Sequence, residues 1–146
     1  EVGEREVSLA HAIDGRSKLS MPANLHVLGT MNTADRSIAH VDIAIRRRFT
    51  FITMMPDIRP VTAQGLALAT EFFNRICDVF IEHAPSEALD LLPGHSYFLA
   101  DDEEELKKRF RFELVPLLDD YLREGYLGPA TTELYAVRDA LEDAVR

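Results

Sequence analysis

The helical spacing of apolar residues in the second part of the chain is the feature that most constrains the fold. After Pro60, apolar side chains recur at about every third or fourth position, which predicts amphipathic helices over residues 62–83, over 102–124 and after Pro129. The expected inward positions are Leu66, Ala69, Phe73, Ile76 and Phe80, then Leu106, Phe110, Leu114, Leu117 and Tyr121, and finally Leu134, Val137, Leu141 and Val145. Three such stripes can bury one another, so we expect an all-α unit over residues 58–146.

Three further details belong to these helices. Pro116 should kink or divide the second one, because proline lacks the backbone N–H and crowds the preceding turn. Glutamates at 103 and 104 precede lysines at 107 and 108 by one helical turn, which predicts two i,i+4 ion pairs. Cys77 lies beside the apolar stripe of the first helix, where we expect it to be buried and unreactive.

The first part of the chain has the pattern of strands. "REVSLAHAIDGRSKLSM", residues 5–21, contains Asp-Gly between two short runs, which predicts a hairpin. "LHVLGTM" (25–31) and "FTFITMM" (49–55) are short apolar runs, and a helix with Ser37 as its N-cap would join them in a βαβ unit. So few strands cannot complete a sheet. We therefore expect residues 1–57 to be part of a larger α/β domain, whose other strands come from residues outside this sequence or from another chain.

Composition excludes several classes of protein. The formal charge of −9 argues against a general nucleic-acid-binding surface, although a local basic site stays possible. The single cysteine allows no internal disulfide and suits a reducing compartment. No apolar run has the length of a membrane span and no signal peptide is recognisable, so we expect a cytoplasmic protein without a membrane partner.

The chemistry is expected in "GTMNTADRSIAHVDIAIRRRF", residues 29–49. Asn32 and Asp35 follow a predicted strand, at the sheet edge where open parallel sheets bind ligands, although both could simply close an Asx-turn. Arg46, Arg47 and Arg48 end the following helix. Attraction to the dipole of that helix would explain one arginine but not three, so a phosphate partner is the better hypothesis.

This order of a polar strand end, a helix, arginines and a second strand resembles the second region of homology of AAA+ ATPases. More narrowly, the string at 29–49, the following "MMPD" and the downstream "GHSYFLADDEEELKKRFRFELVPLLDDYL" resemble the McrB family of nucleotide-driven restriction motors. The resemblance covers about residues 24–125. It implies the C-terminal part of a P-loop AAA+ domain, with a partial parallel sheet that holds the sensor 1 strand (1–57), followed by a helical lid (58–146).

The resemblance also implies roles for individual residues. Asn32 would be sensor 1, which positions the lytic water, and Arg48 would be the arginine finger that completes a neighbouring subunit's site, with Arg47 as the second choice. The remaining candidates for nucleotide or interface contacts are Asp35, Arg36, Asp42 and His95. The first two would organise the interface loop or contact an activating partner, Asp42 could pair with Arg46, and His95 stands where AAA+ lids carry sensor 2. A histidine beside aromatic residues can equally be structural, so both interpretations stay open.

The implied protein is an oligomeric nucleoside triphosphatase that drives DNA translocation in restriction. It would use Mg²⁺ with GTP or ATP, form a ring through the arginine face, bind a nuclease subunit of the McrC type, and read DNA through a different domain. This sequence contains no GxxxxGK[ST] loop and no acidic strand end for magnesium, and the acidic run at 101–105 fits a helix start instead. An alternative is a non-catalytic assembly module that docks on a partner ATPase or nuclease. A phosphate loop encoded upstream of Glu1 would decide for the motor.

We predict that this chain by itself binds neither GTP nor ATP tightly, and that it holds no metal ion, because the backbone amides and lysine that cradle phosphates are absent from its sequence. Isothermal titration calorimetry with each nucleotide and Mg²⁺ measures this directly. Micromolar binding would contradict the prediction, and would mean that His95 and the loop around Asn32 form a nucleotide site unaided.

Overall fold

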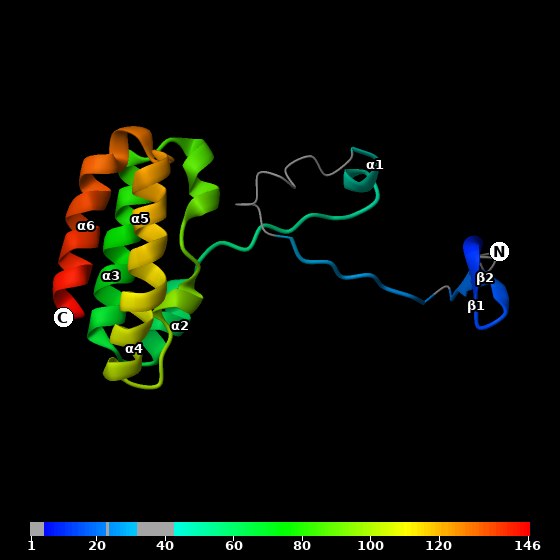
Figure 1. Ribbon diagram of the computed structural model, residues 1–146, viewed down its shortest axis with the longest axis horizontal. Helices are drawn as coiled ribbons and strands as arrows, with labels where there is room; N and C mark the ends of the chain where they lie inside the picture. Colours follow the sequence, from blue (N-terminus) through cyan, green and yellow to red (C-terminus); the bar gives the residue numbers. More distant parts are fainter. Residues whose placement is uncertain (1–4, 23, 32–42) are drawn as a thin grey trace. The chain divides into compact units, whose positions relative to one another are not determined.

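The computed structural model describes residues 5–22, 24–31 and 43–146. The chain divides into two compact units, Glu1–Asn32 and Thr33–Arg146. The secondary structure of the first unit is a β-hairpin and that of the second is almost entirely a helical bundle (Figure 1). Within the described residues, the molecule thus combines one small sheet with helices.

The hairpin confirms the prediction for residues 5–21. Strand β1 (Arg5–Ile13) pairs with β2 (Arg16–Met21) in antiparallel register. Asp14 and Gly15 both have positive φ, at 49° and 75°, which is the backbone that a two-residue hairpin turn with the right-handed strand twist requires. An exposed ion pair of 2.8 Å joins Lys18 to Glu6 across the strands.

The two expected sheet strands at 25–31 and 49–55 do not form, so that prediction is wrong for the chain by itself. Neither segment has a strand assignment, and their apolar side chains are exposed, including Leu28 at 96%, Ile52 at 78% and Met54 at 86%. A strand requires a neighbour for its backbone N–H and C=O groups, and the described chain supplies none to either segment. Of the helix expected between them, the structure describes only α1 (Ile43–Arg46).

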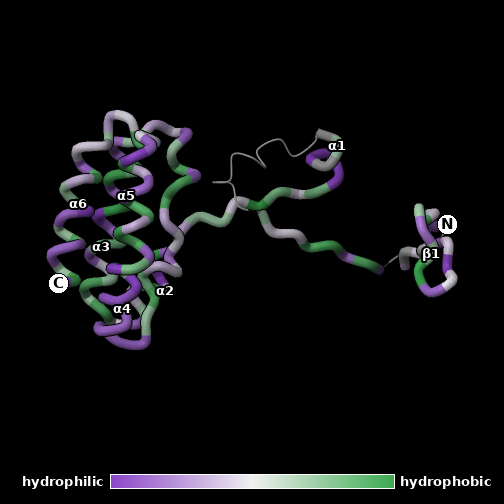
Figure 2. Tube along the Cα trace, viewed as in Figure 1, coloured by the Kyte–Doolittle hydropathy of each residue, from purple (hydrophilic) through white to green (hydrophobic). Residues whose placement is uncertain are grey.

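The bundle is built from short helices joined by tight turns. Its elements in chain order are α2 (Ile58–Ala63), α3 (Ala67–Asp78), the π-helical turn η1 (Val79–His83), the 3-10 turns η2 (Ser86–Leu91) and η3 (His95–Phe98), α4 (Glu103–Arg109), the π-helical turn η4 (Phe110–Leu114), α5 (Val115–Glu124), the 3-10 turn η5 (Gly128–Ala130) and α6 (Thr131–Ala144). Helix α6 packs against α5 and α3 (Figure 1). Every helix of the bundle carries both hydrophobic and hydrophilic residues, as amphipathic spacing predicts (Figure 2).

The first predicted helix is divided where a single helix over 62–83 was expected. Gly65 lies between α2 and α3 with φ of 79°, a left-handed conformation that ends a helix and that glycine adopts without steric cost. Most of the predicted inward stripe is nevertheless buried, namely Ala69, Phe73, Ile76 and Phe80, whereas Leu66 is half-buried.

The second predicted helix is interrupted before Pro116, as the proline predicts, by the π-helical turn η4. The backbone N–H of Val115 donates to the carbonyl of Phe110, five residues back, so this turn holds one more residue than an α-helical turn. The extra residue rotates the following helix relative to the expected pattern. Leu118 is therefore fully buried, whereas Leu117, the predicted inward residue, is only half-buried.

Edge-to-face aromatic contacts occupy the middle of the core. Phe98 lies with its ring centroid 5.2 Å from that of Phe73 and 5.7 Å from that of Phe110, and Phe110 lies 6.0 Å from Phe72. These contacts join α3, η3 and η4, segments far apart in the sequence. Burial of such rings, together with the favourable edge-to-face geometry, stabilises the packing of the three segments.

Cys77 is half-buried, whereas the sequence predicted that it would be buried. Burial, with a smaller contribution from Asp78, raises the pKa of its thiol to about 11, so the thiol stays protonated near neutral pH.

Among the described helices, none combines the length and the apolar character that crossing a membrane requires.

The rotation at η4 predicts opposite outcomes for adjacent leucines. Leu118→Ala should lower the free energy of unfolding by about 2–5 kcal/mol, because it opens a cavity in the core. Leu117→Ala removes the same atoms from a half-buried site and should cost about 1 kcal/mol or less. Urea unfolding followed by circular dichroism measures both. A larger loss for Leu117→Ala would show that the helix continues without the π-helical turn.

Candidate functional site

Four of the predicted site residues lie outside the described residues. Asn32, Asp35, Arg36 and Asp42 all fall within 32–42. The structure describes the arginine tract (Arg46–Arg48), which follows this segment, and His95 in the bundle.

The arginine tract begins at the end of α1. Arg46 is the last residue of that helix, and its guanidinium carbon lies 5.7 Å from the ring centroid of Phe51, within the range of a cation–π contact. Arg47 and Arg48 follow in a turn and are exposed. Neither guanidinium forms an ion pair or a hydrogen bond with any residue in the described part of the chain.

The three arginines therefore differ in how they are engaged. One guanidinium is stacked on a ring, and the next two are open to an external anion. A guanidinium keeps its charge at all relevant pH values and offers a planar fork of donors, which suits phosphate or carboxylate oxygens. Exposed apolar side chains follow the tract directly, with Phe49 at 46% and Met55 at 55% exposure. The segment after the tract is therefore an apolar surface that another protein chain could cover.

His95 is the first residue of η3, and it contacts the start of the bundle. Its ring nitrogen Nδ1 accepts a hydrogen bond of 3.2 Å from the backbone N–H of Asp57, the residue that caps α2. This partly buried bond joins positions 38 residues apart in the sequence. This hydrogen bond supports the structural interpretation of His95. The second ring nitrogen, Nε2, has no partner among the described residues.

The side-chain carboxylate of Asp57 is bound by Arg59. Its carboxylate accepts from the backbone N–H of Arg59 at 2.9 Å and pairs with the guanidinium of that residue, with Arg59 Nε 2.8 Å from Oδ2. The hydrogen bonds from Arg59 lower the pKa of Asp57 to about 2, so the cap is ionised at any pH near neutral. This is an N-cap of the usual kind, which supplies an acceptor to the free amides of the first helical turn.

Two side chains that the sequence pattern did not single out hold the segment around His95. Gln64 donates from Nε2 to the carbonyl of Phe98 at 2.6 Å and accepts from the backbone N–H of Ala100 at 3.0 Å. Arg109 donates from Nη1 to the carbonyl of Ser96 at 3.1 Å and to that of Leu99 at 2.5 Å. No local signal marks Gln64, since its role depends on residues more than 30 positions away.

The run "KKRFR" has a divided role that its sequence suggested only in part. Lys107 and Lys108 pair with Glu103 and Glu104 at 2.9 and 2.7 Å, so the two predicted i,i+4 ion pairs are confirmed. Arg109 turns instead to the backbone of residues 96–99, and Phe110 is buried. The lysines thus lie on a solvated helix face, while the next two residues stabilise the bundle.

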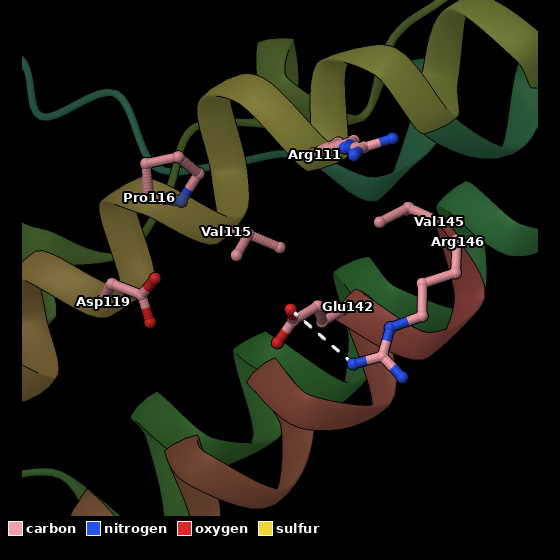
Figure 3. A pocket seen from close by; sticks show the side chains of 7 residues that line it. All are labelled: Arg111, Val115, Pro116, Asp119, Glu142, Val145 and Arg146. Carbon is pink, nitrogen blue, oxygen red and sulfur yellow. Dashed lines mark ion pairs between the residues drawn. The ribbon is translucent and has the colours of Figure 1, made fainter.

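A hollow of about 360 Å³ lies elsewhere on the bundle, where the π-helical turn and α5 meet the end of α6 (Figure 3). Its walls include Arg111, Pro116, Asp119 and Glu142, and none of the predicted site residues. Arg138 bonds both carboxylates, at 2.6 Å to Asp119 and 3.1 Å to Glu142. In the ranges that the structure describes, no three His, Cys, Asp or Glu side chains are grouped as metal ligands would be.

Comparison with known proteins gives one informative match. No family model and no solved structure matches the chain. The chain is 31% identical over 133 residues to the type IV methyl-directed restriction enzyme EcoKMcrB subunit of Escherichia coli strain K12. The aligned part covers 79% of this chain and 29% of that relative, so the chain spans less than a third of the relative's length. This match confirms the resemblance that the motifs indicate.

The bonds of Arg109 predict a cost that its neighbour does not share. Arg109→Met keeps the aliphatic stem but leaves two backbone carbonyls without their charged donor, and should lower the free energy of unfolding by about 1–3 kcal/mol. Lys108→Met removes only an exposed ion pair and should change it by about 0.5 kcal/mol or less. Urea unfolding compares the two variants. Equal effects would contradict the role of Arg109 in holding η3.

Proposed function

The chain is of the McrB type, and we infer that it forms the C-terminal part of the nucleotide-hydrolysing module of an oligomeric restriction motor. The similarity to the EcoKMcrB subunit carries this proposal. The exposed guanidiniums of Arg47 and Arg48, which no described residue engages, support it. In this proposal residues 1–57 complete the α/β part of an AAA+ module, and residues 58–146 form its helical lid.

The chemistry of phosphoryl transfer gives exposed arginines a role at an interface between subunits. The transferred phosphoryl group spreads charge over its equatorial oxygens, so catalysis depends on positioning and on electrostatic stabilisation. A guanidinium supplied by a neighbouring subunit completes the site only in the assembled oligomer. We assign this part to Arg48, with Arg47 beside it. Arg46, stacked over Phe51, is the least suited of the three.

The other site residues take their proposed roles from the resemblance. Asn32 would orient the lytic water, since its amide offers a donor and an acceptor together. Asp35 and Arg36 would organise the loop at the interface between subunits or contact an activating partner, and Asp42 could pair with Arg46. The nucleotide would be GTP or ATP with Mg²⁺, bound mainly by residues outside this sequence, and nothing in these residues distinguishes the two bases.

The proposed partners follow from the type of motor. Copies of the protein would assemble into a ring through the arginine face, and a nuclease subunit of the McrC type would use the ring's hydrolysis cycle. DNA would be read by a part of the protein outside this chain. The negative charge of the chain agrees with that division, because it disfavours a general nucleic-acid surface here.

The proposal is tested by removing single arginines from the full-length protein. Arg48→Ala should lower kcat for nucleotide hydrolysis by about 10³-fold or more while leaving the nucleotide Kd nearly unchanged, because the finger acts on the transition state. Arg46→Ala removes the same charge from the same tract and is the matched control, for which we expect a much smaller loss. Turnover is measured by phosphate release in the assembled oligomer.

Assembly must be followed in the same samples, by analytical ultracentrifugation. Unchanged turnover in Arg48→Ala would remove the finger assignment. If the unsubstituted protein shows no turnover and Arg48→Ala loses assembly, the alternative of a non-catalytic module is favoured instead.

A further inference from the structure

The hollow where η4 and α5 meet the end of α6, called here the α5–α6 hollow, has both an apolar and a charged lining. Its apolar residues are Val115, Pro116 and Val145. Asp119 lies at one side of it, and Arg111 and Arg146 lie at the other (Figure 3). Its volume of about 360 Å³ is within the range of sites that bind small ligands. The hollow therefore has room for a side chain of another molecule.

Arg111 differs from every other cation of the bundle in its charge pairing. The other eight arginines and lysines of residues 58–146 each form an ion pair, whereas Arg111 forms none among the described residues. Carboxylates are not scarce, because acidic side chains in this range outnumber basic ones two to one. The guanidinium of Arg111 is therefore available to an anionic group of another molecule.

The π-helical turn η4 exposes this arginine together with an aromatic ring. Between the buried Phe110 and Leu114, the turn leaves Arg111, Phe112 and Glu113 exposed, and Phe112 is 69% exposed. The guanidinium carbon of Arg111 lies 5.5 Å from the ring centroid of Phe112. Arginine and aromatic residues are enriched at protein interfaces, and π-helical turns are frequent at functional sites. This turn is thus suited to contact another protein.

The two carboxylates that line the hollow are already neutralised. Arg138 binds both of them, at 2.6 Å to Asp119 and 3.1 Å to Glu142. An anionic group that enters beside Arg111 is therefore not opposed by two free charges. An extended acidic surface would still be repelled by the bundle, in which acidic residues predominate. The occupant that fits best carries a single carboxylate within an apolar segment.

We propose that the α5–α6 hollow is a docking site for a segment of a partner protein that carries a carboxylate beside an apolar side chain. The carboxylate accepts hydrogen bonds from the planar fork of Arg111, and the apolar side chain packs on Val115, Pro116 and Val145. A free phosphate ion could use only the first of these contacts. The inference does not rest on the proposed function, because none of the residues assigned there lines this hollow.

NMR titration of the full chain with three short capped peptides tests the docking site. Leu-Glu-Leu carries both groups, Leu-Gln-Leu lacks the charge, and Leu-Lys-Leu reverses it. At millimolar concentration, Leu-Glu-Leu should shift the Nε–H resonance of Arg111 and the methyl resonances of Val115 and Val145. Leu-Gln-Leu should bind about fivefold more weakly, and Leu-Lys-Leu more weakly still. Inorganic phosphate should leave the valine methyl resonances unchanged.

Two substitutions of the same kind test the role of Arg111. Arg111→Gln should weaken the binding of Leu-Glu-Leu about fivefold, and it should fold normally because this side chain is exposed. Arg123→Gln removes the same charge from an exposed arginine of α5 outside the hollow, so it is the matched control and should change nothing.

Three results would overturn the proposal. Equal binding of Leu-Glu-Leu and Leu-Gln-Leu, or unchanged affinity in Arg111→Gln, would remove the carboxylate contact. Unshifted valine methyl resonances at millimolar Leu-Glu-Leu would remove the docking site. Preferential binding of Leu-Lys-Leu, or phosphate that shifts the valine methyl resonances as strongly as Leu-Glu-Leu does, would show that the occupant belongs to another chemical class.

Discussion

The packing of Phe98 between Phe73 and Phe110 is the interaction on which the bundle depends. Each ring comes from a different segment, and together they bring α3, η3 and η4 to one point. The hydrogen bonds of Gln64 and Arg109 would have no fixed target without it, because both bind backbone groups within two residues of Phe98. Apolar burial thus sets the position of the turn, and polar side chains then fix its orientation.

The arginine tract has no comparable support. The segments at 25–31 and 49–55 expose large apolar side chains and form no strand among the described residues. Residues of this kind are suited to a sheet whose two faces are covered. The contrast with the bundle agrees with the proposal that residues 58–146 contain their own core while residues 1–57 contribute strands and charges to a larger assembly.

The sequence predicted well those features that depend on near neighbours. The Asp-Gly hairpin, the ion pairs of Lys107 and Lys108, and the buried stripe of α6 all follow from spacings of a few residues. It failed where one inserted residue changes the helical phase, as at Leu117 and Leu118, and where a strand needs partners from elsewhere. The bond between His95 and Asp57 was also out of reach, since it depends on how two distant turns pack.

The side chain of Gln64 forms hydrogen bonds like those of a parallel β-strand. Its amide donates to the carbonyl before Leu99 and accepts from the N–H after it, which is how a residue of a neighbouring parallel strand would bond to this position. The backbone of Leu99 is correspondingly extended, with φ of −97° and ψ of 131°. One side chain thus makes the two hydrogen bonds that a residue of a neighbouring strand would otherwise make. The extended backbone at Leu99 is thus held inside a helical unit without a sheet.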